Sequence, residues 1–202
     1  MEIEFKPKER SKIEKGIRKK YKKAAKSPKG LFKYPTGSAG LETLKYHSEI
    51  IDALPKAVKD SYCGVGNPLA LGPVKEGEAI LDIGCGSGVD AIFAAVMTGP
   101  AGKVVGIDIT PQMLQRAKEN LSMTDLKNII FEEAAADNLP FSDQNFDVVI
   151  SNGAFNLVPD KPKALSEVFR VLKPKGRLMI ADQILIGELP KEKKQIIKSW
   201  SR

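Results

Sequence analysis

Three alternating glycines mark the part of this sequence best suited to bind a ligand. The segment LDIGCGSGVD, residues 81–90, places Gly84, Gly86 and Gly88 between an apolar run and a helix-like pattern. Glycines at a strand-to-helix turn let the backbone bend tightly and approach a ligand, and the N–H groups that open the helix favour a polar or negative ligand group. Asp82 lies two residues before the first glycine, where its carboxylate can face a cationic group such as the ammonium of an amino acid. The pattern predicts a nucleotide site.

A second acidic residue follows at a spacing that suits the same ligand. Asp108 ends the apolar run GKVVGID and lies 20 residues after Gly88. A carboxylate at such a strand tip can accept hydrogen bonds from both hydroxyl groups of a ribose, which NAD and S-adenosylmethionine both contain. The spacing G-x-G-x-G differs from the G-x-G-x-x-G of dinucleotide sites. On their own, these residues leave both cofactors open.

The two cysteines are the candidates for thiol chemistry. Cys63 stands in SYCGVGNP, after Tyr62 and before two closely spaced glycines, and Cys85 lies inside the glycine turn. The chain shows no secretion signal, so free thiols are expected rather than a disulfide. We interpret Cys63 as a small residue in a turn near the mouth of a substrate pocket.

A few other polar residues could serve a substrate. His47, the only histidine, follows Tyr46 in LETLKYHSEI and has an ordinary pKa of about 6.5, which suits a general base, although packing or surface roles are more common. Tyr46 and Tyr62 could line the pocket or pack beneath it. Asp160 opens the segment DKPKAL as a helix N-cap rather than as a catalytic acid. No convincing acid–base pair and no metal site emerge, so no catalytic residue is assigned.

Alternating strand and helix patterns must position these residues. The expected strands are EAILDIG, GKVVGID, NIIFEEA, FDVVIS and GRLMIADQIL, and the expected helices are GVDAIFAAVMT, TPQMLQRAKENLS and PDKPKALSEVFRVLKP. Such alternation predicts the α/β class, with a doubly wound, Rossmann-like and mostly parallel sheet that has helices on both faces.

Positive charge is concentrated in the first part of the chain. Residues 1–33 contain 13 Lys and Arg against 4 Glu, whereas the remaining 19 basic and 21 acidic residues give about −2 of the formal net charge of +7. Ile13, Ile17, Tyr21 and Ala25 recur every four residues and form one narrow apolar stripe on a cationic helix. Two interpretations stay open: a lid helix packed on the body, or a surface for phosphate or anionic lipid.

The remaining organisation follows from composition. We expect a basic helical arm and lid over residues 1–60, with a mobile connector at 27–40 and a second helix at about 41–54, and a ligand-binding domain over 61–202. Hydrophobic content of 42% and charged content of 28% are typical of a globular chain. No apolar run reaches membrane-spanning length, so we expect a cytoplasmic protein.

Two longer blocks narrow the choice of family. NLPFSDQNFDVVISN (138–152) and EVFRVLKPKGRLMIAD (167–182), in this order after the glycine turn, resemble the class I S-adenosylmethionine-dependent methyltransferases. GVGNPLALGPVKEGEAILDIGCGSGVDAIFAA and ISNGAFNLVPDK are similar to the arsenite methyltransferases, over roughly residues 61–195. The resemblance implies the strand order 3-2-1-4-5, a small-molecule methyl acceptor and S-adenosylmethionine as cofactor. It also implies a cofactor site formed by Asp82, Gly84, Cys85, Gly86, Gly88, Asp108, Ile109, Met113, Ala136, Asp137 and Asn152.

Within that site the resemblance implies separate roles. Asp82 and the three glycines would hold the methionine part, Asp108 the ribose, and Ile109 and Met113 the adenine, while Asn152 would border the methyl-transfer pocket. An acid in many relatives accepts a hydrogen bond from the adenine amino group, and this chain has Ala135 there, with Asp137 two residues on as a substitute.

The chain departs from the arsenite methyltransferases at their arsenic ligands. Trivalent arsenic is soft and prefers thiolates. The family pattern implies thiols at the positions of Val65 and Gly153, and Cys63 lies two residues before the first of them. We therefore expect an acceptor other than arsenite, bulkier and organic, in a pocket formed by Tyr46, His47, Tyr62, Cys63 and Gly153.

The end of the sequence leaves further hypotheses open. The family fold continues with strands for which too few residues remain here, so we expect an uncovered edge on the fifth strand and either self-association or a partner chain there. A non-catalytic or partner-dependent module is one alternative, supported by Ala135. A nucleic-acid-directed methyltransferase that uses the basic arm is another, but it is not favoured because no aromatic residues interleave with the lysines.

Overall fold

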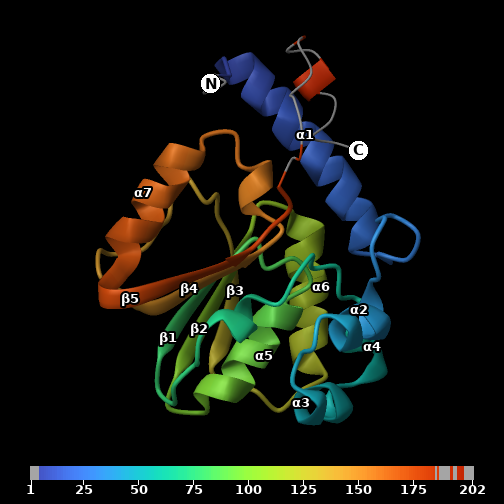
Figure 1. The fold of residues 1–202 in the computed structure, drawn as a ribbon, viewed down its shortest axis with the longest axis vertical. Helices are drawn as coiled ribbons and strands as arrows, with labels where there is room; N and C mark the ends of the chain where they lie inside the picture. Colours follow the sequence, from blue (N-terminus) through green and yellow to red (C-terminus); the bar gives the residue numbers. More distant parts are fainter. Residues whose placement is uncertain (1–4, 185, 187–191, 193–194, 198–202) are drawn as a thin grey trace.

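A five-stranded parallel sheet lies at the centre of the computed structural model, which describes residues 5–184, 186, 192 and 195–197 (Figure 1). Its strands are β1 (Ala79–Ile83), β2 (Lys103–Asp108), β3 (Ile129–Glu133), β4 (Phe146–Asn152) and β5 (Leu172–Ala181). They follow the order β3-β2-β1-β4-β5, and every neighbouring pair is parallel. The predicted fold class and strand order are confirmed.

Helices cover both faces of this sheet, because successive side chains of a strand point to opposite faces. Ile80 of β1 packs with α5 (Val89–Thr98) and α6 (Pro111–Ser122). Its neighbour Leu81 packs with α7 (Lys161–Val171) on the other face. Two short 3₁₀ helices, η1 (Pro68–Leu71) and η2 (Phe155–Leu157), lie in the connections. Asp160 caps α7 by accepting a hydrogen bond from the Lys163 amide, as predicted.

The helical region before β1 differs from the prediction. The single helix expected at about 41–54 is wrong: the chain forms α2 (Gly37–Thr43), α3 (Ser48–Ala53) and α4 (Lys56–Asp60). Lys45 has a φ of 56°, a left-handed conformation that cannot continue a right-handed helix. Helix α2 also begins inside the segment expected to be a connector. Leu41 and Val58 pack in one cluster with Phe93 of α5, so hydrophobic contacts cross the predicted domain boundary at residue 60. The boundary itself stays a prediction.

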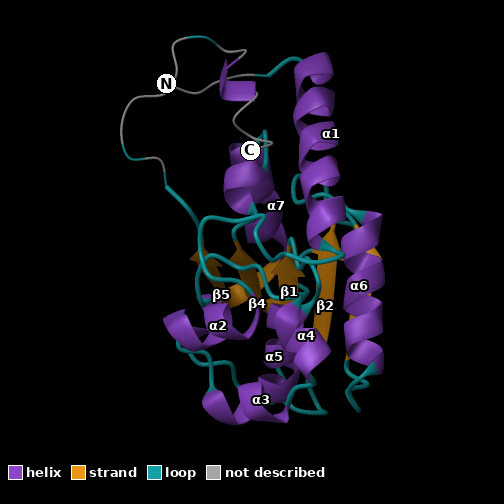
Figure 2. Ribbon diagram, turned by 90° about the vertical axis from the view of Figure 1, so that its right-hand side faces the viewer, coloured by secondary structure: helices purple, strands orange, loops and turns teal. Residues whose placement is uncertain are grey.

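The basic arm forms the helix α1 (Pro7–Ala24), which lies beyond one end of the sheet in both views (Figures 1 and 2). Ile13 and Ile17 are buried and cluster with Phe5 and Ile196. Ala24, rather than the expected Ala25, completes the buried stripe. Two ion pairs add to this packing: Arg10 with Asp160 at 3.0 Å and Arg18 with Glu133 at 3.1 Å. These contacts favour the lid interpretation of the arm.

The outer edge of the sheet at β5 is the other feature that bears on partners. Within the described residues, β5 pairs only with β4. The strand begins at Leu172, earlier than predicted, with an irregular register beside Phe146 and Val148, and it ends at Ala181. Self-association or a partner chain at this edge stays a prediction. In the part of the chain that the structure describes, no helix is long and apolar enough to cross a membrane.

Candidate cofactor and acceptor site

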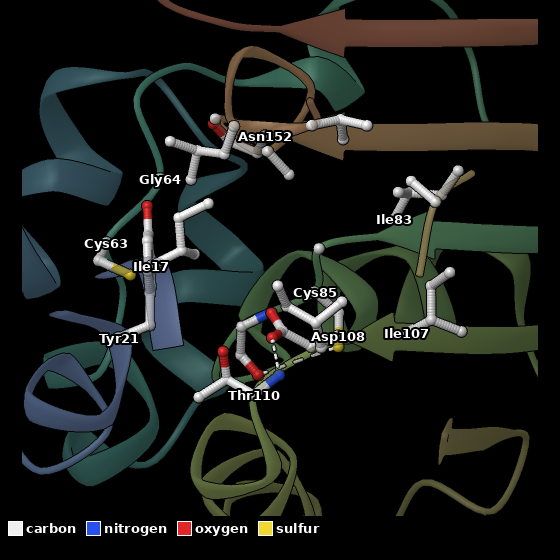
Figure 3. Close-up of a pocket in the computed structure, with 18 of the residues that line it drawn as sticks. Ile17, Tyr21, Cys63, Gly64, Ile83, Cys85, Ile107, Asp108, Thr110 and Asn152 are labelled. Carbon is white, nitrogen blue, oxygen red and sulfur yellow. Dashed lines mark hydrogen bonds between the residues drawn. The ribbon is translucent and has the colours of Figure 1, made fainter. Parts of the chain in front are cut away.

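The main pocket lies where β1, β2 and β4 end, beneath α1 (Figure 3). In parallel α/β sheets, ligands bind outside the carboxyl ends of the strands at the point where the strand order reverses, which here lies between β1 and β4. The lining comes from the glycine turn, the ends of β2 and β4, residues 134–137, the turn at 62–65, η2 with the residues after it, and α1. Cofactor-type and acceptor-type residues thus share one cavity.

The glycine turn brings its backbone to the pocket surface. Gly84 has a φ of 72°, and a Cβ added to it would lie 2.3 Å from the Ala154 Cβ, so a side chain is excluded there. Gly86 has a φ of 53°, and an added Cβ would meet no atom within 4 Å, because this glycine borders open space. Gly88 does not line the pocket: an added Cβ would lie 2.6 Å from the Phe131 ring, so this glycine serves helix–strand packing.

Asp108 is fixed at the pocket wall by two backbone amides (Figure 3). Its Oδ2 accepts from the Gly86 amide at 3.0 Å and its Oδ1 from the Thr110 amide at 2.7 Å. Burial raises the pKa of this carboxyl group, and the two amides oppose that shift. A carboxylate oxygen can accept two hydrogen bonds, so each oxygen keeps capacity for a ligand hydroxyl. This arrangement fits the ribose role that the sequence predicts.

Asp82 lies beneath the glycine turn, not on the pocket surface. It is only 1% exposed, and its Oδ2 has no hydrogen-bond partner among the described residues. Burial first, then the Asp90 and Asp108 carboxylates, raise its pKa well above the usual range. A buried acceptor without a partner is costly. A cationic ligand group near the turn would lower this cost, so the orphaned oxygen fits a cofactor with an ammonium group.

Of the residues predicted to flank the adenine, some line the pocket and one does not. Ile109, Ala136 and Asp137 line the pocket, as do Cys85 and Ala135. Met113 is fully buried and lies outside the lining. No contact of the Asp137 side chain decides whether it replaces the acid absent at Ala135, so that substitution stays a prediction.

Asn152, at the end of β4, lines the pocket and is the centre of a polar network in its wall. Its Oδ1 accepts from the Val65 amide at 2.8 Å and the Gly66 amide at 3.0 Å. Its Nδ2 lies 2.7 Å from the Gly66 carbonyl oxygen and 3.0 Å from Oδ2 of Asp90. The same amide nitrogen lies within 3.2 Å of the hydroxyl groups of Tyr46 and Tyr62. This network ties the 62–66 turn to the end of β4.

Asp90 completes the network, and sequence reasoning missed it as a site residue. It stands in the first turn of α5, lines the pocket and accepts a short hydrogen bond from the Tyr46 hydroxyl. Burial raises its pKa to about 6, although the hydrogen bonds from Tyr46 and Asn152 act in the opposite direction. Asp90 lies two residues after Gly88, the last glycine of the turn, and this position was the feature of the sequence that could have indicated its role. Near neutral pH this carboxylate adds negative charge to the part of the cavity that holds the glycine turn.

The predicted acceptor residues separate into three groups. Tyr62, Cys63 and Gly153 line the pocket, and Tyr46 lies behind it in the Asn152 network. His47 is exposed, precedes α3 as its N-cap residue and is absent from the lining, so its predicted place in the pocket is wrong. The left-handed Lys45 turns the chain so that Tyr46 points inward while His47 remains at the surface.

Cys63 is not an activated thiol. Burial, reinforced by the negative charges of Asp108 and Asp90, raises its pKa to about 12. Thiolates are the nucleophiles and the ligands of soft elements, so a protonated thiol is poorly suited to either task. Its carbonyl oxygen accepts a hydrogen bond from the Tyr34 hydroxyl at 3.1 Å, which joins the 62–65 turn to the connector after α1. Both cysteines are free.

Val65 and Gly153 face each other in the part of the cavity where the sequence predicts the acceptor. A Cβ added to Gly153 would lie 3.2 Å from Val65 Cγ1 and 3.3 Å from Val65 Cγ2, and Gly153 has a φ of 70°. The resemblance implies thiols at these two positions in arsenite methyltransferases. Here the same space is apolar, and a valine partly fills it. No group of three or more His, Cys, Asp or Glu able to hold a metal occurs within the described parts of the chain.

The lid helix contributes lining residues that the sequence pattern only suggested. Glu14, Ile17, Arg18 and Tyr21 of α1 reach the pocket, together with Tyr34 of the following connector. Burial raises the pKa of Tyr34, so its hydroxyl stays protonated. The apolar stripe of α1 indicated that one side of the helix is buried, but it did not indicate which surface the helix covers.

Comparisons with known proteins agree with this geometry. Residues 74–202 match the model of a family described as a methyltransferase domain. The arsenite methyltransferase of Halobacterium salinarum is 37% identical over 155 residues, which cover 77% of this chain and 39% of that protein. The demethylmenaquinone methyltransferase of Lactobacillus johnsonii is 38% identical over 110 residues, which cover 54% of this chain and 45% of that protein.

A solved structure adds support for the fold. The arsenic(III) S-adenosylmethionine methyltransferase of Chlamydomonas reinhardtii superposes with a TM-score of 0.61 at 33% identity, covering 74% of this chain and 50% of that one. The chain thus spans half or less of each of these relatives. The glycine turn, the placement of Asp108 and the matched domain lead to one conclusion: this chain belongs to the S-adenosylmethionine-dependent methyltransferase family.

Proposed function

We propose that this protein transfers a methyl group from S-adenosylmethionine to a small organic acceptor other than arsenite. The observation that carries the proposal is the composition of the cavity at the ends of β1, β2 and β4. Asp108 and the glycine turn form its cofactor end, while Ile17, Tyr21, Val65, Leu157 and Val158 form an apolar wall at its acceptor end. An apolar wall of this kind favours an acceptor with substantial hydrocarbon or aromatic surface.

The cofactor supplies an electrophilic methyl group on a sulfonium, so the protein's task is to hold and desolvate the reactants. Asp108 and the Gly86 backbone orient the nucleoside end. Asp90, with a pKa of about 6, places negative charge near the glycine turn at neutral pH, which favours a cationic ligand, and Asp82 adds an unpartnered oxygen beneath the turn. The lid helix α1 covers the cavity and excludes water through Ile17 and Tyr21. This division of roles requires no acid–base pair.

Calorimetric titration with S-adenosylmethionine, S-adenosylhomocysteine and NAD tests the cofactor half of the proposal. We expect micromolar binding of the first two compounds and none of NAD. Release of S-adenosylhomocysteine in the presence of a panel of apolar and aromatic acceptors then tests the other half. Binding of none of the three compounds would overturn the proposal and favour a non-catalytic or partner-dependent module.

Arsenite methylation is the second candidate, because an arsenite methyltransferase and an arsenic(III) methyltransferase match most of the chain. We expect equilibrium dialysis to detect no arsenite binding at micromolar concentration, since the Cys63 thiol is protonated and no second acceptor-side thiol exists among the described residues. The double variant Val65→Cys with Gly153→Cys is expected to gain arsenite binding. Arsenite binding by the unchanged protein that is lost in Cys63→Ala would refute this exclusion.

A further inference from the structure

The outer face of α1 carries a continuous row of lysines that the proposed function does not use. Five exposed residues, which we call the lysine face, recur at steps of four and three: Lys8, Lys12, Lys15, Lys19 and Lys22. At 100° per residue they fall within an arc of about 80°, and they span about 21 Å along the helix. The buried residues Ile13, Ile17 and Ala24 lie on the opposite side of the helix.

Among the described residues, no acidic side chain forms an ion pair with this row. The acids of α1 are Glu9, at the first turn, and Glu14, which lines the pocket. Among the described residues the two arginines of α1 form the ion pairs that hold the lid, whereas none of the five lysines forms an ion pair. Like charges at i,i+3 and i,i+4 destabilise a helix. Binding to a polyanionic surface would offset this repulsion between the lysines, because each of them would be attracted to the surface.

We propose that the lysine face binds the surface of an anionic lipid membrane. Clustered lysines on an amphipathic helix suit such a surface, since each attracts anionic headgroups without requiring a defined geometry. The apolar side of α1 is already buried against the body, so attachment is electrostatic and peripheral. Nucleic acid is the lesser alternative, because the face has no aromatic residue for base stacking and no free arginine for base recognition.

The pocket gives a second reason to favour lipid over nucleic acid, and this reason rests on the proposed function. The inner side of α1 covers a cavity whose acceptor end is walled by apolar residues, among them Ile17, Leu157 and Val158. Apolar acceptors partition into membranes. A helix that binds the membrane with one side and covers the cavity with the other would hold the enzyme where such acceptors concentrate.

Vesicle co-sedimentation of the full chain tests the proposal without any need for turnover. At about 0.1 M salt we expect binding to vesicles of three parts phosphatidylcholine to one part phosphatidylglycerol, no binding to phosphatidylcholine alone, and loss of binding at about 0.5 M salt. The variant Lys12→Gln, Lys15→Gln, Lys19→Gln is expected to bind about 100-fold more weakly, at about fivefold per lysine.

A matched control carries the same change of charge at the other end of the sheet. The variant Lys75→Gln, Lys103→Gln, Lys127→Gln replaces three exposed lysines that lie just before β1, at the start of β2 and before β3. It is expected to bind within about twofold of the unchanged protein, since these residues are distant from α1.

Equal weakening of both variants, or no binding of the unchanged protein to anionic vesicles, would overturn the proposal. Tighter binding to a single-stranded RNA than to vesicles would assign the face to nucleic acid instead. Because vesicle binding does not depend on cofactor binding, its failure leaves the proposed function intact.

Discussion

Replacing Asp108 by alanine is expected to weaken S-adenosylmethionine binding by at least about 100-fold. The carboxylate is held by the Gly86 and Thr110 amides and lines the pocket, where it can accept further hydrogen bonds from ligand hydroxyls. Hydrogen bonds to a charged group contribute about 1.5 to 3 kcal/mol each, so the loss of two bonds to ribose hydroxyls removes about 3 to 6 kcal/mol. Calorimetric titration of the variant measures this loss directly.

The same substitution is expected to change the free energy of unfolding much less. It leaves the Gly86 and Thr110 amides without their acceptor, which is destabilising. It also removes a buried carboxylate whose pKa is raised by burial, which is stabilising near neutral pH because ionised Asp108 is disfavoured in the folded state. These effects oppose each other, so loss of binding should not reflect loss of the fold.

Two further variants distinguish the effect of the Asp108 charge on cofactor binding from the effect of removing any acidic residue. Asp108→Asn keeps the size of the side chain but loses the charge and one acceptor, and it should fall between the alanine variant and the unchanged protein. Asp125→Ala removes an exposed acid in the loop between α6 and β3 and should bind normally. If Asp108→Ala binds within about threefold of the unchanged protein, the ribose role of Asp108 is wrong.

The sequence was sufficient for the framework of this site because its determinants are local. Alternating apolar strands and amphipathic helices specify a parallel sheet, and glycines at a strand-to-helix turn specify where a ligand approaches it. Gly84, Gly86 and Asp108 lie within a few residues of a strand end, so their positions follow from the strand order. The resemblance to methyltransferases then favoured S-adenosylmethionine over NAD as the cofactor.

The acceptor end could not be predicted in the same way, since it depends on contacts between distant segments. The Asn152 network joins Tyr46 to a residue 106 positions later. One left-handed residue, Lys45, decides that Tyr46 is buried and His47 exposed. The placement of α1 over the pocket depends on ion pairs such as Arg10 with Asp160, which are 150 residues apart. Local propensities do not encode such pairings.

Replacing Asn152 by alanine is expected to lower the free energy of unfolding by about 2 to 6 kcal/mol. The Val65 and Gly66 amides lose the oxygen that accepts from both of them, and each part-buried donor left unpaired costs about 1 to 3 kcal/mol. Chemical denaturation measures this effect. Asn128→Ala provides a control, because Asn128 likewise has two hydrogen bonds to the backbone, here as donor to the carbonyl groups of Ala95 and Gly99, but lies away from the cofactor pocket.

The variant should also change how cofactor binding depends on pH. Asp90 has a pKa of about 6 in the folded protein, above its usual 3.8, so its contribution to stability is fully present below about pH 4 and is lost as pH rises through about 6. A cationic cofactor favours the ionised carboxylate, so the affinity of the unchanged protein should rise as pH increases through about 6. Asn152 donates one of the two hydrogen bonds that oppose the shift in Asp90.

Without Asn152 the pKa of Asp90 should therefore rise further, and the pH at which cofactor affinity increases should move upward with it. Calorimetric titrations between about pH 5 and pH 8 measure this midpoint in the unchanged protein and in Asn152→Ala. Asn128→Ala should lose stability but keep the original midpoint, and Asp90→Asn should lose the part of the dependence that is centred near pH 6. An unchanged midpoint in Asn152→Ala would mean that Asp90 does not interact with the bound cofactor, and the charge role assigned to it in the pocket would then fail.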